Sequence, residues 1–342
     1  MDSTDLLFML AGMAISFASS LIGVRWWIGK AHLIGFTGRD MNKRGEVYAA
    51  EAGGIWVSFG VALGLLSFIG LQTYVLNDES LLRNYISLAL LLFMSGYLGF
   101  LDDVLGWKKG LRAIYRVLLM APISLPLVVL KVGIPTITLP LIGAVDFGLA
   151  YYLLLIPIGI IGASNGFNML AGYNGLEALQ GILLMLFMGI LGFVKGLDGL
   201  LTASLIMASG IGGFLVYNKY PARVFPGNTF TYAVGAYFAA LAIMYKTVKF
   251  SLILFTLYFI ELALFIRGLR DGVYKENFGR PMEDGSLLPP YDKSYSLTHL
   301  AIKSITRLKG NAREPEIVLF IALLQALVGL TALWLSASSI LT

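Results

Sequence analysis

The sequence contains no cysteine, only two histidines and few charged residues. Without cysteine, disulfide bonds, thiolate catalysis and cysteine-ligated iron–sulfur clusters are excluded, and His32 and His299 are too few for a histidine-rich metal site. Charged residues form 13% and hydrophobic residues 58% of the 342 residues, whereas a soluble domain has about 25% charged residues. This composition, with a mean hydropathy of +0.80, predicts a polytopic integral membrane protein.

The sequence also lacks linkers rich in proline, glycine or serine, low-complexity tracts and internal repeats of about 20 to 50 residues. Residues 1–342 are therefore expected to form a single membrane domain. No nucleic-acid-binding motif is present. The net charge of +5 favours lipid head groups or an anionic substrate as partners, and not nucleic acid.

Ten apolar segments of helix length predict an all-α fold with about ten transmembrane helices. They cover residues 6–24, 55–76, 85–101, 113–130, 149–163, 178–194, 200–217, 229–245, 250–266 and 315–337. Acidic residues precede the first segment and basic residues follow it, which is the reverse of the charge order in a cleavable signal peptide. We therefore expect the first segment to be a retained helix.

The basic residues predict the orientation in the membrane. If successive segments cross in opposite directions, 20 of the 25 Lys and Arg residues lie in five loops on one side. These loops cover residues 25–51, 102–116, 164–177, 218–228 and 267–314. By the positive-inside rule this side is cytoplasmic, and both termini lie outside. On the outer side, segment 132–147 is expected to form a short hairpin; on the cytoplasmic side, the mixed-charge loop 267–314 is a candidate lid or substrate clamp.

The stretch GYLGFLDDVLGWKKGLR, residues 96–112, is the most informative part of the chain. An uncharged run of helix length ends there at two adjacent carboxylates, Asp102 and Asp103, and basic residues follow. Because a charge at the bilayer centre costs about 2.5 to 3.5 kcal/mol on insertion scales, such a pair indicates a membrane-embedded site for phosphates and a divalent metal. The alternative is an interfacial charge pair that merely ends the span.

The stretch NGFNMLAGYNGLEA, residues 165–178, places Asn165, Asn168 and Asn174 around a glycine-containing turn between two spans. Asparagine offers a neutral oxygen suited to a hard cation such as Mg²⁺ and amide hydrogens suited to a nucleobase edge. Asn and Gly are also ordinary turn residues, so a purely structural role is the alternative.

Two further polar stretches lie on the same predicted side, at residues 37–54 and 223–236. The second contains GNTF, residues 227–230, which opens a predicted span. The free amides of a helix N-terminus favour an anionic phosphate, although Asn228 and Thr229 could equally cap the helix. Four polar stretches on one side predict a single active site.

Together these stretches resemble the polyprenyl-phosphate N-acetylhexosamine-1-phosphate transferase superfamily, and most of all its branch that makes dolichyl-diphosphate N-acetylglucosamine. The motifs that carry the resemblance are LGFLDDVL, NGFNMLAGYNGLEA, VFPGNTFTYAVGA and GRDMNK with the later Glu51. The resemblance implies a ten-helix membrane enzyme in which a polyprenyl (dolichyl) phosphate attacks the β-phosphorus of UDP-N-acetylglucosamine and UMP leaves. It implies Mg²⁺ as cofactor, with Mn²⁺ as a substitute, and is compatible with a homodimer.

The resemblance also implies roles for individual residues. Asp102 and Asp103 match the catalytic acidic pair, which deprotonates the lipid phosphate or organises the metal site, and Asn168 matches a Mg²⁺ ligand. Asn174 matches the residue that reads the uracil. The remaining substrate-binding candidates are Arg39, Asp40, Met41, Glu51, Asn165 and, for the lipid phosphate, either Arg112 or Arg116.

Two departures from the family pattern stand out. Relatives carry GDTF with an Asp on the metal, whereas this chain has Asn228; its amide oxygen remains a candidate Mg²⁺ ligand with one charge fewer. The Arg-rich HRxPR sequence of eukaryotic relatives is missing, and Arg280 is the nearest candidate for a pyrophosphate contact.

The isolated His299 disfavours the muramoyl-pentapeptide branch, and the short loop favours a prokaryotic, archaeal plasma membrane.

Two other functions are compatible with parts of the sequence. A secondary transporter would explain polar residues within a polytopic chain, but its usual inverted repeats are not visible. A transferase relative that has lost activity and serves as a binding subunit would explain Asn228.

Overall fold

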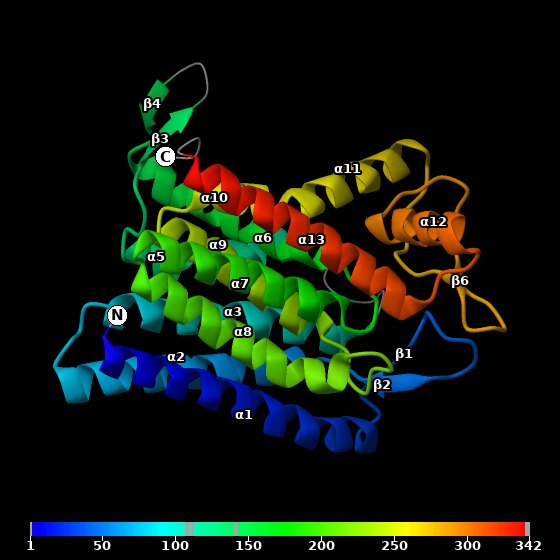
Figure 1. Cartoon of the computed structure of the whole chain (residues 1–342), viewed down its shortest axis with the longest axis horizontal. Helices are drawn as coiled ribbons and strands as arrows, with labels where there is room; N and C mark the ends of the chain where they lie inside the picture. Colours follow the sequence, from blue (N-terminus) through cyan, green and yellow to red (C-terminus); the bar gives the residue numbers. More distant parts are fainter. Residues whose placement is uncertain (1, 107–109, 111–112, 140–142, 339–342) are drawn as a thin grey trace.

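The computed structural model describes residues 2–106, 110, 113–139 and 143–338. Its main feature is a bundle of long helices (Figure 1). The first half contains α1 (Ser3–Leu33), α2 (Gly54–Leu76), α3 (Leu82–Leu105), α4 (Ala113–Met120), a 3-10 turn η1 (Ala121–Ser124), α5 (Leu125–Val129), a π-helical turn η2 (Tyr151–Leu155) and α6 (Ile156–Met169). The second half contains α7 (Leu176–Lys195), α8 (Asp198–Asn218), α9 (Gly227–Met244), α10 (Val248–Leu254), α11 (Thr256–Arg270), α12 (Leu297–Lys309) and α13 (Glu314–Ala337).

All ten predicted apolar segments are helical, and the prediction of a multi-pass all-α protein is confirmed. Among the described residues, seven helical segments are long and apolar enough to cross a membrane, with η2 and α6 counted as one segment, and the pair α10 and α11, bent by 56°, makes an eighth candidate. The other two segments differ from the expectation. Segment 113–130 is divided into α4, η1 and α5, because Pro122 and Pro126 interrupt regular helix hydrogen bonding.

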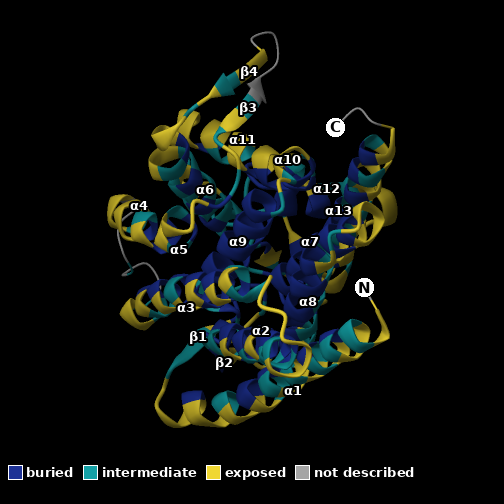
Figure 2. Cartoon of the chain, turned by 90° about the vertical axis from the view of Figure 1, so that its left-hand side faces the viewer, coloured by how far each residue is buried: buried dark blue, intermediate teal, exposed yellow. Residues whose placement is uncertain are grey.

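Segment 229–245 corresponds to α9, which lies inside the bundle. Every residue from Thr229 to Met244 is buried, and Figure 2 shows α9 in the dark-blue centre of the molecule. Its N-terminus approaches two neighbouring backbones closely. A Cβ added to Gly99 of α3 would lie 2.4 Å from the Asn228 carbonyl oxygen, and one added to Gly54 of α2 would lie 2.4 Å from the Phe230 amide nitrogen. Glycine at both positions therefore allows α2 and α3 to pack directly on the first turn of α9.

In the part of the chain that the structure describes, three two-stranded antiparallel sheets lie between the helices. They pair β1 (Thr37–Arg39) with β2 (Tyr48–Ala50), β3 (Thr136–Leu139) with β4 (Gly143–Asp146), and β5 (Arg280–Pro281) with β6 (Leu287–Leu288). The β3–β4 pair confirms the predicted hairpin and lies at the same end of the bundle as both termini (Figure 1). Sheets β1–β2 and β5–β6 lie at the opposite end.

The predicted loop 267–314 has more regular structure than expected. It contains β5, β6 and the 13-residue helix α12. Ser296 caps α12 by accepting a hydrogen bond from the Thr298 amide, a favourable N-terminus that the SYSLTH sequence encodes. Basic residues in its last turn suit the C-terminal end of the helix dipole.

Candidate active site

Asp102 lies near the end of α3 and is only 4% exposed. One of its carboxylate oxygens, Oδ2, accepts hydrogen bonds from the Asn228 side-chain amide at 3.1 Å and the Tyr232 hydroxyl at 2.9 Å. The same oxygen lies 3.9 Å from Nε of Arg116, which is half-buried and also donates to the Tyr232 hydroxyl at 3.3 Å. Asp102 is therefore a buried carboxylate with a cation beside it.

Asp103 points to the N-terminus of α9. Its Oδ1 accepts from the Asn228 amide at 2.7 Å, and its Oδ2 accepts from the Thr229 amide at 3.0 Å and the Thr229 hydroxyl at 2.6 Å. Gly227 has φ +70°, and a Cβ there would lie 2.2 Å from the Asp103 carboxylate. The glycine of GNTF thus lets α9 begin directly against Asp103.

These bonds revise one expectation. The amides of Asn228 and Thr229 in the first turn of α9 are not available to a phosphate, because the Asp103 carboxylate already accepts from both. Nor do the side chains of Asn228 and Thr229 cap the helix; the Asp103 carboxylate does so from α3. The two neighbouring carboxylates consequently face different groups.

Hydrogen bonds between side chains link three predicted residues, Asn168, Asn228 and Asp102. Asn168 at the end of α6 donates from its amide to Oδ1 of Asn228 at 3.0 Å, and Asn228 donates in turn to Asp102. Carboxylate and amide oxygens are the hard donors that Mg²⁺ accepts, and Mg²⁺ typically uses one or two carboxylates together with substrate phosphates. The donor set formed by Asp102, Asn168 and Asn228 fits such an ion. In the described part of the chain, no three His, Asp or Glu side chains form a ready metal cage.

Glu51 lies between β2 and α2, where its carbonyl oxygen accepts from the Trp27 indole at 2.7 Å and its amide donates to Phe36 at 3.1 Å. Burial and the nearby Asp103 carboxylate raise the pKa of Glu51 to about 7. Glu51 therefore lies near enough to Asp103 for the two carboxyl groups to interact, and its role in substrate binding stays a prediction.

A second cluster of buried charges surrounds Asn174. The Asn174 side chain donates to Asp40 at 3.0 Å, and its backbone amide donates to Glu314 at 2.7 Å. Lys43 bonds to Glu314, lies 3.5 Å from Asp40 and stands 4.2 Å over the Tyr220 ring. The structure thus joins the predicted Asp40 and Asn174.

Asn42 also belongs to the second cluster, because its backbone amide donates to Asp40 at 3.1 Å. Four polar residues in these clusters were not predicted from sequence: Tyr232, Lys43, Glu314 and Asn42. Lys43 and Asn42 occur in the quoted GRDMNK motif, so the motif could have indicated them. Glu314 begins the last helix, 140 residues after Asn174. Only the fold brings these two residues together.

Other predicted residues are less closely connected. Asn165 donates to the Ile161 carbonyl at 2.9 Å and to the Met120 sulfur at 3.3 Å, so its side chain faces α4 and not Asn228. Arg39 has an exposed side chain in β1, and Met41 is half-buried. Two basic candidates remain. Arg280 is exposed in β5, and Arg112 lies outside the described residues.

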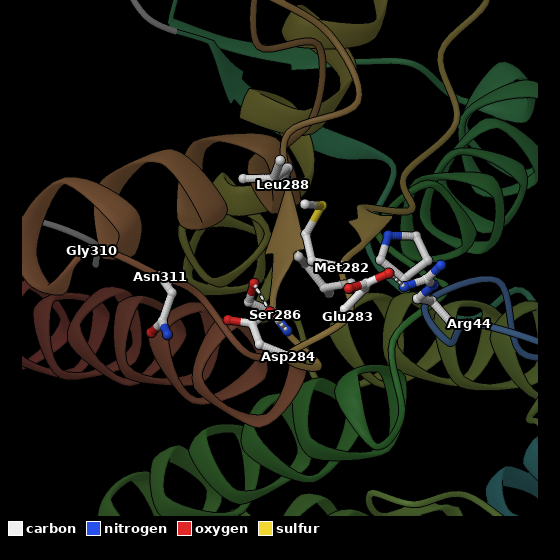
Figure 3. A pocket seen from close by; sticks show the side chains of 10 residues that line it. Arg44, Met282, Glu283, Asp284, Ser286, Leu288, Gly310 and Asn311 are labelled. Carbon is white, nitrogen blue, oxygen red and sulfur yellow. Dashed lines mark hydrogen bonds and ion pairs between the residues drawn. The ribbon is translucent and has the colours of Figure 1, made fainter.

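A hollow of about 570 Å³ opens near β5 and β6. Figure 3 shows Met282 and Ser286 in this hollow, with Arg44 and Glu283 on one side. The Arg44 and Glu283 side chains form an exposed ion pair at 2.8 Å. None of the lining residues belongs to the predicted site, so the hollow is separate from the acidic pair.

The fold and this geometry define a polytopic membrane protein with a buried acidic and amide site at helix ends. Comparisons with known proteins identify the family. A family model described as Glycosyl transferase family 4 matches residues 85–246. A protein of Sulfolobus acidocaldarius, provisionally named UDP-N-acetylglucosamine–dolichyl-phosphate N-acetylglucosaminephosphotransferase, is 33% identical over 322 residues, which cover 93% of each chain.

Two further relatives place the chain more broadly. A protein of Saccharolobus solfataricus with the same provisional name is 32% identical over 339 residues, covering 98% of this chain and 99% of the relative. A phospho-N-acetylmuramoyl-pentapeptide-transferase of Clostridium botulinum is 27% identical over 266 residues, covering 74% of this chain and 79% of the relative.

The chain belongs to Glycosyl transferase family 4, the polyprenyl-phosphate N-acetylhexosamine-1-phosphate transferases. It is a multi-pass membrane enzyme that transfers a phospho-sugar to a polyprenyl phosphate. The family resemblance seen in the sequence is confirmed. The secondary-transporter hypothesis is wrong, because this is a family of enzymes.

Proposed function

We propose that the enzyme transfers N-acetylglucosamine-1-phosphate from UDP-N-acetylglucosamine to dolichyl or another polyprenyl phosphate, releasing UMP. The observation that carries this proposal is the hydrogen-bonded chain from Asn168 through Asn228 to Asp102. Its oxygens suit a metal-bound diphosphate. The names of the two archaeal relatives support the choice of sugar and lipid.

In the proposed reaction, an oxygen of the lipid phosphate forms a bond to the β-phosphorus of the nucleotide sugar. The bond from that phosphorus to the bridging oxygen breaks, and UMP departs with that oxygen. Arg116 would bind the lipid phosphate, because its guanidinium lies beside Asp102 and is partly accessible. Asp102 would accept the proton of that phosphate or orient it, while Asp103 holds the start of α9 in place.

The donor set of Asp102, Asn168 and Asn228 would hold Mg²⁺, which neutralises phosphate charge during phosphoryl transfer. The second cluster would bind the nucleotide, with the Asn174 amide at the uracil and Asp40 and Lys43 beside it. Positioning and charge neutralisation are the main requirements of such a transfer. The site then needs no covalent intermediate with the protein.

We also propose that this end of the bundle faces the cytoplasm of an archaeal cell. Most basic residues belong to the five loops that the sequence predicts on this side, and such an excess is typical of the cytoplasmic side. The termini and the β3–β4 hairpin would then lie outside.

The direct test is UMP release by the purified protein with UDP-N-acetylglucosamine, dolichyl phosphate and Mg²⁺. We expect release to require all three and to stop with EDTA or in Asp102→Asn. Asp146→Asn, the same change in the hairpin at the far end, should retain activity. If UDP-N-acetylgalactosamine or UDP-N-acetylmuramoyl-pentapeptide supported faster release, the sugar assignment would be wrong. Absence of release with every nucleotide sugar would overturn the proposed reaction.

A further inference from the structure

The turn at residues 169–175 connects α6 to α7 and joins the proposed metal site to the proposed nucleotide site. Asn168 precedes it and Asn174 lies near its end. Gly172 and Gly175 have φ of +108° and +85°, so the turn departs from regular structure. Its position therefore depends on contacts with other segments.

The side chain of Asn277 supplies two of these contacts. Its amide donates to the Met169 carbonyl at 2.9 Å and to the Ala171 carbonyl at 2.7 Å. The backbone carbonyl of Asn277 accepts from the Tyr173 hydroxyl at 3.1 Å and from the Thr298 hydroxyl at 2.8 Å. One residue thus connects the turn to α12.

Lys275 holds the side chain of Asn277 in place. It is nearly fully buried, donates to the Asn277 side-chain oxygen at 2.5 Å and to the Met169 carbonyl at 3.5 Å, and forms an ion pair with Glu261 of α11. Glu261 has no exposed surface and also accepts from the Ser296 hydroxyl at 3.1 Å and the Leu297 amide at 2.7 Å. Lys275 is therefore attached to two helices.

A third connection runs through Asn42, a buried residue of the β1–β2 connection. Its side chain donates to the Gly172 carbonyl at 2.9 Å and accepts from the Gly279 amide at 3.0 Å. Its backbone amide donates to Asp40 at 3.1 Å. The segment around Asn277, the turn and the Asp40 loop are thus held together by one side chain.

We propose that residues 275–279, here called the brace, are positioning residues that set the geometry of both asparagines in the site. By fixing the carbonyls of Met169 and Ala171, the brace holds Asn168 against Asn228 and Asn174 against Asp40. It acts on the two asparagines through the turn. The inference rests on the proposed function for the roles of Asn168 and Asn174.

Asn277→Asp is the sharpest test, because it keeps the size of the side chain and removes both amide donors. Asn311→Asp, the same change beside the hollow of Figure 3, is the matched control. We expect Asn277→Asp to speed amide hydrogen exchange in residues 169–174 and to weaken binding of UMP and of Mg²⁺. Loss of a supporting hydrogen bond to a ligand typically costs about 10- to 100-fold, and we expect an effect of this size. Asn311→Asp should change neither quantity.

Tyr173→Phe removes the hydrogen bond from the Tyr173 hydroxyl to the Asn277 carbonyl and keeps both side-chain donors of Asn277, so it is the milder variant if Asn277→Asp does not fold. It should produce a smaller change in the same direction. Exchange and UMP binding within twofold of wild type in both variants would overturn the proposal. Because hydrogen exchange requires no turnover, it still tests the brace if the wild-type protein releases no UMP, which would refute the proposed function alone.

Discussion

Thr229 donates both its backbone amide and its hydroxyl to the same carboxylate oxygen of Asp103, at 3.0 and 2.6 Å. Asp102, the next residue toward the N-terminus, accepts instead from the side chains of Asn228 and Tyr232 beside Arg116. Their different hydrogen-bond partners therefore divide two adjacent residues of identical chemistry between two roles. One supports the start of a buried helix, and the other faces the proposed reacting groups.

This division predicts different consequences for Asp102→Asn and Asp103→Asn. Asp102→Asn should lower turnover at least about 100-fold, with a small change in melting temperature. Asp103→Asn should lower the free energy of unfolding by about 1–2 kcal/mol, because one oxygen that accepts from the start of α9 becomes a donor. Turnover and thermal unfolding of both variants in detergent provide the measurement. Equal stability losses in the two variants would contradict the division.

Asn228→Asp should make the protein depend more strongly on Mg²⁺. Without the ion, a new carboxylate beside Asp102 replaces the 3.1 Å hydrogen bond and lowers the melting temperature. With the ion, the added charge should strengthen binding and raise the melting temperature progressively as the Mg²⁺ concentration exceeds its Kd. Melting curves across a Mg²⁺ titration, with Ca²⁺ for comparison, test this. A variant whose melting temperature does not respond to Mg²⁺ would argue against a metal at this position.

Lys275→Met should destabilise the protein by about 3–5 kcal/mol, because it leaves Glu261 buried without its partner charge. Adding Glu261→Gln should recover part of this loss. Lys293→Met is the matched control, since Lys293 pairs with Asp271 on the surface, where such pairs contribute about 0–1 kcal/mol. Chemical unfolding of the three variants measures the difference. Similar losses for Lys275→Met and Lys293→Met would show that the buried pair has no special contribution.

His299 should make stability depend on acidity. Its Nδ1 accepts from the Tyr295 amide at 3.2 Å and its Nε2 donates to the Glu276 carbonyl at 2.9 Å, an arrangement that requires the neutral ring. Burial lowers the pKa of His299 from 6.5 to about 4. The charges of Lys275 and Lys303 act in the same direction, whereas the hydrogen bond to Glu276 acts against it.

Because the unfolded chain then binds a proton that the folded one does not, stability is complete above pH 6.5 and is lost as the pH falls toward 4. The loss is on the order of 3 kcal/mol at the acidic limit. In His299→Gln, whose amide can make both bonds without titrating, the melting temperature should fall less between pH 6.5 and 5. Parallel pH profiles for the two proteins would exclude His299 as the cause.

Much of the fold follows from sequence, because the membrane imposes simple rules. Long apolar runs predicted the helical segments, and the Gly and Pro residues within 132–147 predicted the β3–β4 hairpin. The acidic pair and the Asn-rich turn were recognisable, since polar residues at the ends of apolar helices are costly unless they have partners. These are local signals.

The rest depends on contacts between distant segments. Nothing near Glu314 indicates that it accepts from Asn174, and nothing in DDVL distinguishes an acid that caps α9 from one that faces Arg116. Asn165 and Asn168 are three residues apart on one helix, yet only Asn168 reaches Asn228. Their side chains point in different directions around the helix axis, and tertiary packing decides which of them meets Asn228. The internal position of α9 likewise depends on its neighbours, because its composition resembles that of a membrane span.

A helix with no residue in contact with lipid has no hydrophobic length to match to a bilayer. The residues from Thr229 to Met244 are all buried, so α9 is insulated from the thickness and fluidity of the host membrane, which act on the lipid-exposed helices around it. The acidic pair is fixed to the first turn of this insulated helix. An enzyme that must accept a substrate dissolved in the membrane would thus have its proposed reaction centre attached to a helix that, from Thr229 to Met244, does not contact the membrane.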